Sequence, residues 1–173
     1  MAEGRTLTPE QTKSIKDLVN SLFEEEGILG VVVVDETGLP ICSSGNIKEE
    51  AELALSNTVL GVYVEGAKVY QELGTPYIDN IIIEGKDVKT YISSEEGGRA
   101  YIAIFCSPET NMAVIRVVAK NILKQIHDIL EKTAERAAEF FDRTEKLTWL
   151  TPEERKRWKE IAGFIERLAK KKK

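Results

Sequence analysis

The sequence predicts an α+β fold in which a sheet of five strands is covered by helices. Apolar residues follow helical and strand periodicity in the order helix, two strands, helix, three strands, helix. Turn residues separate the strands within each group. Residues 28–34 and 99–106 are almost continuously apolar, which is typical of strands covered on both faces. We therefore expect these two strands at the centre of the sheet.

The first helix begins at Thr8, which serves as the N-cap, with Pro9 at the first helical position and Gln11 completing a capping box. Its apolar stripe consists of Ile15, Leu18, Val19, Leu22 and Phe23, and it ends before Gly27.

Two strands follow, over residues 28–34 and 39–43, joined by a tip with the sequence Asp-Glu-Thr-Gly. An acidic tip with a glycine suits either a tight turn or a loop that holds a metal or a phosphate. No other segment supplies ligands to complete such a site, so we interpret residues 35–38 as a turn.

The second helix is predicted over residues 48–73, because Gly74 and Pro76 end it. Three strands are predicted at residues 77–84, 88–93 and 99–106, the first pair joined by a two-residue type II′ loop at Gly85-Lys86. The third helix is expected to begin near residues 107–109 and to continue to about residue 146. A second capping box at residues 151–154 begins a last helix.

Composition and charge exclude several classes of protein. The 173 residues carry a net charge of −5, but residues 151–173 alone carry +5, so the rest of the chain carries −10. An acidic body argues against nucleic acid as the main ligand. The start lacks the features of a secretory signal, and no apolar run is long enough to span a membrane, so we expect a cytoplasmic protein.

No motif in the sequence indicates catalysis, a cofactor or a metal, so we expect a protein that is not an enzyme. Residues 61–68 resemble a phosphate-binding loop, but Ala67 interrupts the required Gly-Lys pair and the segment lies within a helix. His127 is the single histidine, and we interpret it as a surface or capping residue. Arg99 is the best candidate for an arginine finger, although a solvated strand-end arginine is the favoured interpretation. Cys42 and Cys106 are expected to be buried, reduced thiols.

The stretch LGVVVVDETGLPICSSG, followed by the helix AELALSNTVLGVYVEGAKVYQELG and three strands, resembles the roadblock/LC7 domain family. The resemblance implies a five-stranded antiparallel sheet in the order 2-1-5-4-3, with helices on both faces. It places the domain at residues 8–130, followed by a helical extension with a basic tail at residues 131–173.

The resemblance also implies a homodimer that binds and regulates, or scaffolds, a small Ras-like GTPase. Family members pair through the third strand and pack their second helices side by side. An apolar edge strand is itself prone to pairing. The alternative is that its isoleucines only face the core. The dimer interface expected from this pattern consists of Tyr77, Ile78, Asp79, Asn80, Ile81, Ile82 and Ile83, with Leu60, Tyr63, Ala67 and Tyr70 from the second helix.

The second helix carries two apolar stripes, although a surface helix needs one. One stripe, expected to cover the sheet, consists of Leu55, Val59, Val62, Gly66, Val69 and Leu73. The other holds the interface residues of this helix, and we favour an interface over the alternative, which is deep burial under the C-terminal extension. Residues expected to contact another protein are Val64, Glu65, Lys68, Gln71 and Glu72.

The C-terminal extension allows two interpretations. An apolar face formed by Trp158, Ile161, Ile165 and Leu168 favours a helical hairpin that folds back on its own domain or across the dimer. The lysines at residues 170–173 suit contact with an acidic membrane or partner, which we favour less. A structural assembly subunit of the dynein-light-chain type, or an adaptor using the C-terminal helices, is the alternative function.

Overall fold

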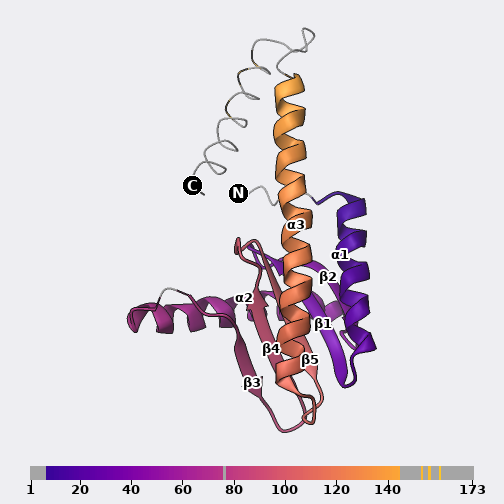
Figure 1. Ribbon diagram of the computed structural model, residues 1–173, viewed down its shortest axis with the longest axis vertical. Coiled ribbons are helices and arrows are strands. Elements are labelled where there is room, and N and C mark those ends of the chain that lie inside the picture. Colours follow the sequence, from indigo (N-terminus) through magenta and orange to yellow (C-terminus); the bar gives the residue numbers. More distant parts are fainter. Residues whose placement is uncertain (1–6, 76, 145–152, 154–155, 157–159, 161–173) are drawn as a thin grey trace. The chain divides into compact units, whose positions relative to one another are not determined.

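A computed structural model describes residues 7–75 and 77–144, together with positions 153, 156 and 160 (Figure 1). The chain divides into two compact units, Met1–Ile129 and Leu130–Lys173, and everything that follows concerns the first unit unless stated. No helix in the described part of the chain is both long enough and apolar enough to cross a bilayer.

The first unit contains one five-stranded antiparallel sheet in the order β2-β1-β5-β4-β3, which confirms the expected fold. The elements in chain order are α1 (Pro9–Ser21), the 3-10 turn η1 (Leu22–Glu24), β1 (Ile28–Asp35), β2 (Pro40–Gly45), α2 (Glu49–Glu72), β3 (Ile81–Glu84), β4 (Lys89–Ser94), β5 (Ala100–Cys106) and α3 (Met112–Thr144).

The two central strands separate two cores, because successive side chains point to opposite faces. On one face Val32, Val34, Ile92 and Ala103 pack with Val59 of α2. Figure 1 shows α1 and the first part of α3 on the other face. The residues buried from these two helices are Ile15, Val19, Ile115, Ala119, Ile122, Leu123 and Ile126. The sheet is thus covered on both sides, as the apolar runs predicted.

Two local predictions near the start of the chain are confirmed. Thr8 and Gln11 form the capping box, each side chain bonding the other residue's backbone N–H. At the tip between β1 and β2, Asp35 Oδ1 accepts hydrogen bonds from Thr37 N at 2.8 Å and Leu39 N at 3.0 Å. Gly38 adopts a φ of 89°, which favours glycine. The Asp35 side chain therefore bonds backbone N–H groups within the tip itself, as expected of a tight turn.

Three predicted boundaries are wrong. The third strand begins at Ile81 rather than Tyr77, and just before it the carbonyls of Ile78 and Asp79 accept hydrogen bonds from side-chain hydroxyls instead of from the backbone of β4. Its hairpin turns at Lys86-Asp87, since Gly85 N donates to Val88 O at 2.9 Å and Gly85 lacks the positive φ that a type II′ turn requires.

The third helix begins at Met112, after a turn in which Thr110 N donates to Ser107 O at 3.1 Å. Asn111 supplies the cap, because its Oδ1 accepts from Ala113 N at 2.9 Å. The predicted start at residues 107–109 is therefore three to five residues too early. A turn that returns the chain to Gly27, whose carbonyl accepts from Ser107 N at 2.8 Å, occupies that stretch.

Candidate functional site

The outer edge of the sheet is formed by β3, which pairs with β4 alone in the single chain. Ile81 points toward α2 and packs on the core that contains Val59. Ile82 and Ile83 remain 37% and 45% exposed. An edge strand with unpaired backbone groups and exposed isoleucines is a template for pairing with another strand.

The apolar surface of α2 differs from the predicted stripes. Ser56 and Val59 are buried, and Leu60, Val62 and Tyr63 pack partly buried on the same core. Figure 1 shows the C-terminal end of α2 extending past the edge of the sheet at β3.

The last turns of α2 therefore have no sheet beneath them. Val69, expected to cover the sheet, is 59% exposed, and Leu73 is 72% exposed. Leu60 and Tyr63, assigned to the outer stripe, contact the core instead. The exposed apolar surface of this helix lies at its C-terminal end, beside β3.

Gly66 allows α2 to approach the edge of the sheet closely. A Cβ atom at this position would lie 2.5 Å from Ile81 Cδ1 and 3.8 Å from Ile78 Cδ1. A Cβ atom at Gly61, one and a half turns earlier, would meet nothing within 4 Å. The glycine that the helix needs for packing is therefore the second of the two.

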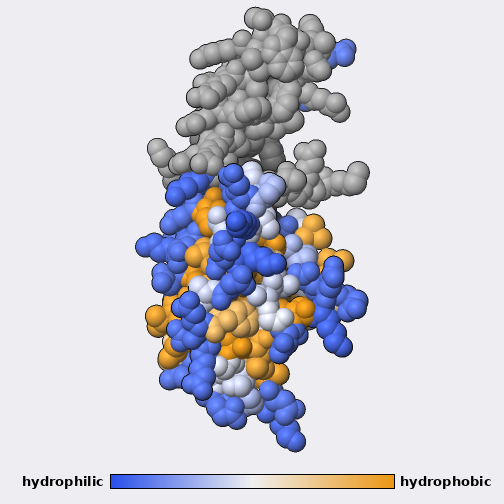
Figure 2. Space-filling view, turned by 90° about the vertical axis from the view of Figure 1, so that its right-hand side faces the viewer, coloured by the Kyte–Doolittle hydropathy of each residue, from blue (hydrophilic) through white to orange (hydrophobic). Residues whose placement is uncertain are grey.

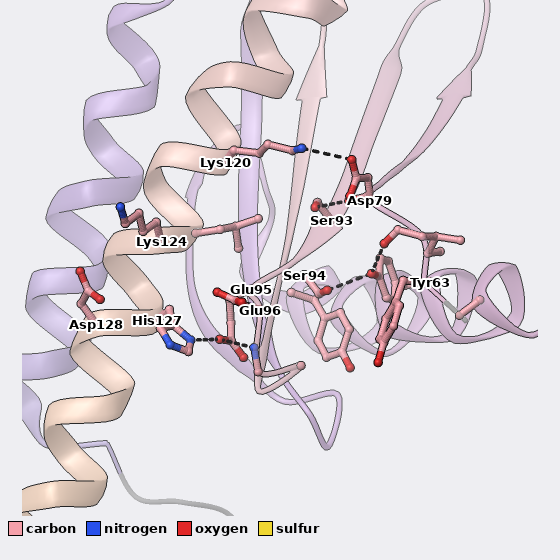
Figure 3. Close-up of a pocket in the computed structure, with 17 residues that line it drawn as sticks. Tyr63, Asp79, Ser93, Ser94, Glu95, Glu96, Lys120, Lys124, His127 and Asp128 are labelled. Atoms are coloured by element: carbon pink, nitrogen blue, oxygen red, sulfur yellow. Dashed lines mark hydrogen bonds and ion pairs between the residues drawn. The ribbon is translucent and has the colours of Figure 1, made fainter. Parts of the chain in front are cut away.

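A groove of about 1070 Å³ lies between residues 77–79, the turn from β4 to β5, and α3 (Figure 3). Tyr63, Ala67 and Tyr101 line one side, and the rings of Tyr63 and Tyr101 meet edge to face with centroids 5.1 Å apart. Lys120, Lys124 and His127 line the side formed by α3.

A buried carboxylate organises the turn at one end of this groove. Glu95 is 2% exposed, and its oxygens accept hydrogen bonds from Gly97 N at 2.8 Å and Arg99 N at 2.5 Å. His127 Nδ1 lies 2.5 Å from Glu95 Oε2, and Arg99 Nε lies 3.6 Å from Oε1. Glu95 therefore ties the β4-β5 turn to α3.

The ionisation of Glu95 follows from these contacts. Burial would raise the pKa of the carboxyl, but the hydrogen bonds from Arg99 N–H, His127 and Gly97 N–H, with the charge of Arg99, lower it below its usual value. The interpretation of His127 as a surface or capping residue is thus wrong. Arg99, whose side chain is 12% exposed, is also not a solvated strand-end residue.

Neither the two cysteines nor the metal-ligating side chain types form a reactive site in the described part of the chain. Both cysteines are free and buried, as predicted. Burial raises the pKa of Cys42 to about 12 and that of Cys106 to about 11, so the nucleophilic thiolate is scarce at neutral pH. Within residues 7–75 and 77–144, the His, Cys, Asp and Glu side chains that the structure describes form no group that could hold a metal ion.

A family model described as "Roadblock/LC7 domain" matches residues 14–104, which is more than half of the chain. The chain belongs to the Roadblock/LC7 domain family. Members of this family are generally regulators or adaptors rather than enzymes. No curated protein matches the chain.

Several solved structures share the Roadblock/LC7 fold at low sequence identity. MglB from Myxococcus xanthus is 18% identical with a TM-score of 0.66, over 73% of this chain and 95% of that one. The gliding protein MglB from Thermus thermophilus is 15% identical with a TM-score of 0.65, over 73% and 96% of the two chains. A Roadblock/LC7 domain from Streptomyces avermitilis is 16% identical with a TM-score of 0.61, over 66% and 95%. At these identities the likeness supports the fold.

Of the predicted interface residues of this Roadblock/LC7 domain, those at 77–83 lie along the β3 edge of the sheet, whereas Leu60 and Tyr63 pack on the core. Tyr77 is 88% exposed, and Tyr70, near the C-terminal end of α2, is 49% exposed. The predicted partner-binding residues Val64, Glu65, Lys68, Gln71 and Glu72 are all exposed on α2, with Lys68 and Glu65 paired at 2.6 Å. Trp158, Ile161, Ile165 and Leu168 lie outside the described residues.

Sequence reasoning missed the groove and Glu95. Glu95 precedes two glycines in a polar turn, a context that normally indicates solvent exposure. Its partner His127 lies 32 positions later, and nothing in the sequence marks the two as neighbours.

Figure 2 shows the side of the molecule on which α1 lies, where hydrophilic side chains surround scattered hydrophobic ones. The isoleucine run that the sequence analysis singled out does leave Ile82 and Ile83 partly exposed on β3.

Proposed function

We propose that this Roadblock/LC7 domain is a non-enzymatic homodimeric platform that binds and regulates, or scaffolds, a small Ras-like GTPase. The observation that carries the proposal is the open apolar edge of β3 beside the exposed C-terminal half of α2. After Tyr77, the large apolar side chains most exposed there are those of Leu73, Val69, Tyr70 and Ile83. Family membership supports the same conclusion.

Pairing of two copies through β3 provides hydrogen-bond partners for the unpaired backbone groups of this edge strand. Two antiparallel copies of a four-residue strand exchange backbone hydrogen bonds and form one continuous sheet of two chains. The same approach brings the exposed ends of two α2 helices together, so their apolar side chains leave water. Both contributions come from surfaces that the single chain leaves uncovered.

The exposed outer face of α2 is the surface we assign to the GTPase. It carries Val64 and the charged pair Glu65 and Lys68, and it lies beside the proposed dimer contact. Arg99 is held by Glu95, so an arginine finger from this position receives no support. Regulation would therefore act by positioning the GTPase's own catalytic groups.

The test uses Ile83→Lys, because a lysine on the pairing edge opposes strand addition without entering the core. Analytical ultracentrifugation should show a dimer for the natural chain and a monomer for the variant, with equal circular dichroism. Binding to Ras-like GTPases encoded in the same genome, loaded with GDP or a GTP analogue, should weaken in the variant. Leu53→Lys makes the same change of charge at an exposed apolar side chain near the start of α2, away from β3, and is the charge-matched comparison. A monomeric natural chain, or no binding and no change in GTP turnover, would refute the proposal.

A second surface favours the alternative of an assembly subunit. Val114 and Val117 are 43% and 69% exposed on α3, on the opposite face of the sheet from α2. A partner that is lost from Val117→Lys but retained by Ile83→Lys would indicate an adaptor that holds another subunit without using the dimer surface.

A further inference from the structure

Residues 77–80 leave the sheet although their pairing register is available. Ile81 lies opposite Ile92, so continuing the ladder would set Asn80 opposite Ser93 and Asp79 opposite Ser94. Tyr77 and Ile78, together with the isoleucines at 81–83, led to the prediction of a strand beginning at Tyr77. Something in the structure therefore keeps these residues from pairing.

Two hydroxyl groups donate to backbone carbonyls of this segment, and a third hydroxyl bonds one of these two. Tyr63 has a single O–H, which donates to Ile78 O at 3.0 Å. Ser94 Oγ lies 2.8 Å from Tyr63 Oη, and since the tyrosine proton is already used, the serine donates. Ser93 Oγ donates to Asp79 O at 2.6 Å. These three bonds, which we call the hydroxyl latch, replace ladder bonds with side-chain bonds.

The latch holds the segment from both faces of the sheet. Ser93 shares a face with Tyr91, on the side of α3, whereas Ser94 shares a face with Ile92, on the side of α2. Figure 3 shows Tyr63 and Ser94 together on one side of the segment and Ser93 and Asp79 on the other.

Helix α3 adds two weaker contacts from its side. Lys120 Nζ lies 3.1 Å from Asp79 Oδ2, and an Arg116 guanidinium nitrogen lies 3.5 Å from Asn80 Oδ1. Lys120 and Asp79 are both well exposed, so this ion pair contributes little by itself. The hydroxyls, which are partly buried, are the main restraint.

We propose that Tyr63 is a positioning residue whose hydroxyl latch limits the outer edge of the sheet to Ile81–Glu84 and thereby fixes the register in which a second copy pairs. This inference rests on the proposed dimer. A slip by one residue would turn every side chain to the wrong face, but a slip by two preserves the faces. An edge of eight residues, 77–84, would keep most of its ladder bonds after such a slip, whereas the four-residue edge loses half of its length to each one. The latch is thus a device for specificity in pairing.

Tyr63→Phe is the direct test, because it keeps the ring and its edge-to-face contact with Tyr101 but removes both hydrogen bonds of the hydroxyl. Tyr70→Phe is the matched control. It makes the same chemical change on the same helix, at an exposed hydroxyl for which the described residues provide no hydrogen bond.

The first readout is amide hydrogen exchange over residues 77–80, which can be measured whether or not a second copy pairs. In the described structure the latch occupies carbonyls of this segment, and the N–H groups of residues 77–80 donate no hydrogen bond. Release in Tyr63→Phe lets Asp79 and Asn80 pair with β4, so we expect about tenfold slower exchange there. Tyr70→Phe should match the natural chain. Ser93→Ala, which frees the Asp79 carbonyl without altering α2, should also slow exchange. Equal exchange in Tyr63→Phe, Ser93→Ala and the natural chain would overturn the latch.

The second readout is the distance between spin labels at Lys86→Cys, on the exposed hairpin tip, in the two copies of the dimer. The natural chain and Tyr70→Phe should give one narrow distance. Tyr63→Phe should add a population displaced in register by two residues, or about 7 Å along the strand at about 3.4 Å per residue. A single unchanged distance in Tyr63→Phe would overturn the role in register. A natural chain that gives no distance between copies would overturn the dimer, and the register role with it, while the exchange result would still decide whether the latch exists.

Discussion

The buried carboxylate of Glu95 needs a structural explanation, and its partners supply one. Its two oxygens are shared among two backbone N–H groups, the imidazole of His127 and the guanidinium of Arg99. Burying an ion is unfavourable unless such partners compensate. Glu95 therefore links the β4-β5 turn to α3, and its negative charge strengthens the contacts with His127 and Arg99.

Glu95→Gln should destabilise the fold in a pH-dependent way. The amide keeps the shape but loses the negative charge that His127 and Arg99 face, so we expect a loss of about 1–3 kcal/mol in the free energy of unfolding at neutral pH. Because the folded-state pKa of Glu95 lies below its usual 4.5, its contribution is present above that pH and is lost as the pH falls through the folded value. Urea denaturation at several pH values should show the gap between natural and variant chains closing in acid.

Glu96→Gln is the control for this measurement, because Glu96 is the adjacent carboxylate and is exposed. It should change stability little at any pH. A Glu95→Gln variant as stable as Glu96→Gln at neutral pH would mean that the cluster contributes no net stability.

At the level of elements, α2 carries two glycines with opposite consequences. An exposed glycine within a helix costs about 1 kcal/mol relative to alanine. Gly61→Ala meets open space and should raise the free energy of unfolding by about that amount. Gly66→Ala gains the same helix propensity but pushes its methyl group into Ile81, which packs on the core. We expect Gly66→Ala to be the less stable of the two, by thermal or urea denaturation, and the reverse order would contradict the packing at this crossing.

The sequence predicted the elements whose determinants are local and missed those that depend on distant residues. The capping box at Thr8 and the turn at Asp35 each satisfy their hydrogen bonds within four residues, so both were recognisable. The sheet order came from the family resemblance, with the apolar runs of the two central strands in agreement. The start of β3 depends instead on Tyr63 and Ser93, which lie 15 and 14 positions away from their acceptors. The predicted strand included Ile78 and Asp79, whose carbonyls accept from these two hydroxyls in the structure.

At the scale of the whole molecule, charge is divided between an acidic body and a basic C-terminal segment. The chain carries −5 in total and +5 within residues 151–173. An anionic membrane would attract the segment and repel the rest, so the two effects oppose each other. We favour contact with protein for this segment over contact with lipid.

Deletion of residues 170–173 is therefore expected to leave vesicle binding unchanged. Co-sedimentation with phosphatidylserine vesicles at low salt should recover little of either the full chain or the shortened one, since both are acidic overall. Phosphatidylcholine vesicles provide the uncharged comparison. Strong, salt-sensitive recovery of the full chain that disappears on deletion would favour a membrane adaptor instead.

The two buried cysteines can be used to measure local unfolding of the sheet. Cys42 lies on β2, at one edge of the sheet, and Cys106 lies at the end of central β5. Their raised pKa values and burial keep both thiols silent toward alkylating reagents while the fold is closed. Each thiol can be alkylated only when its own strand unfolds locally. The alkylation rate of Cys42, measured by mass spectrometry, therefore reports fraying of the sheet edge, and that of Cys106 reports opening of the centre.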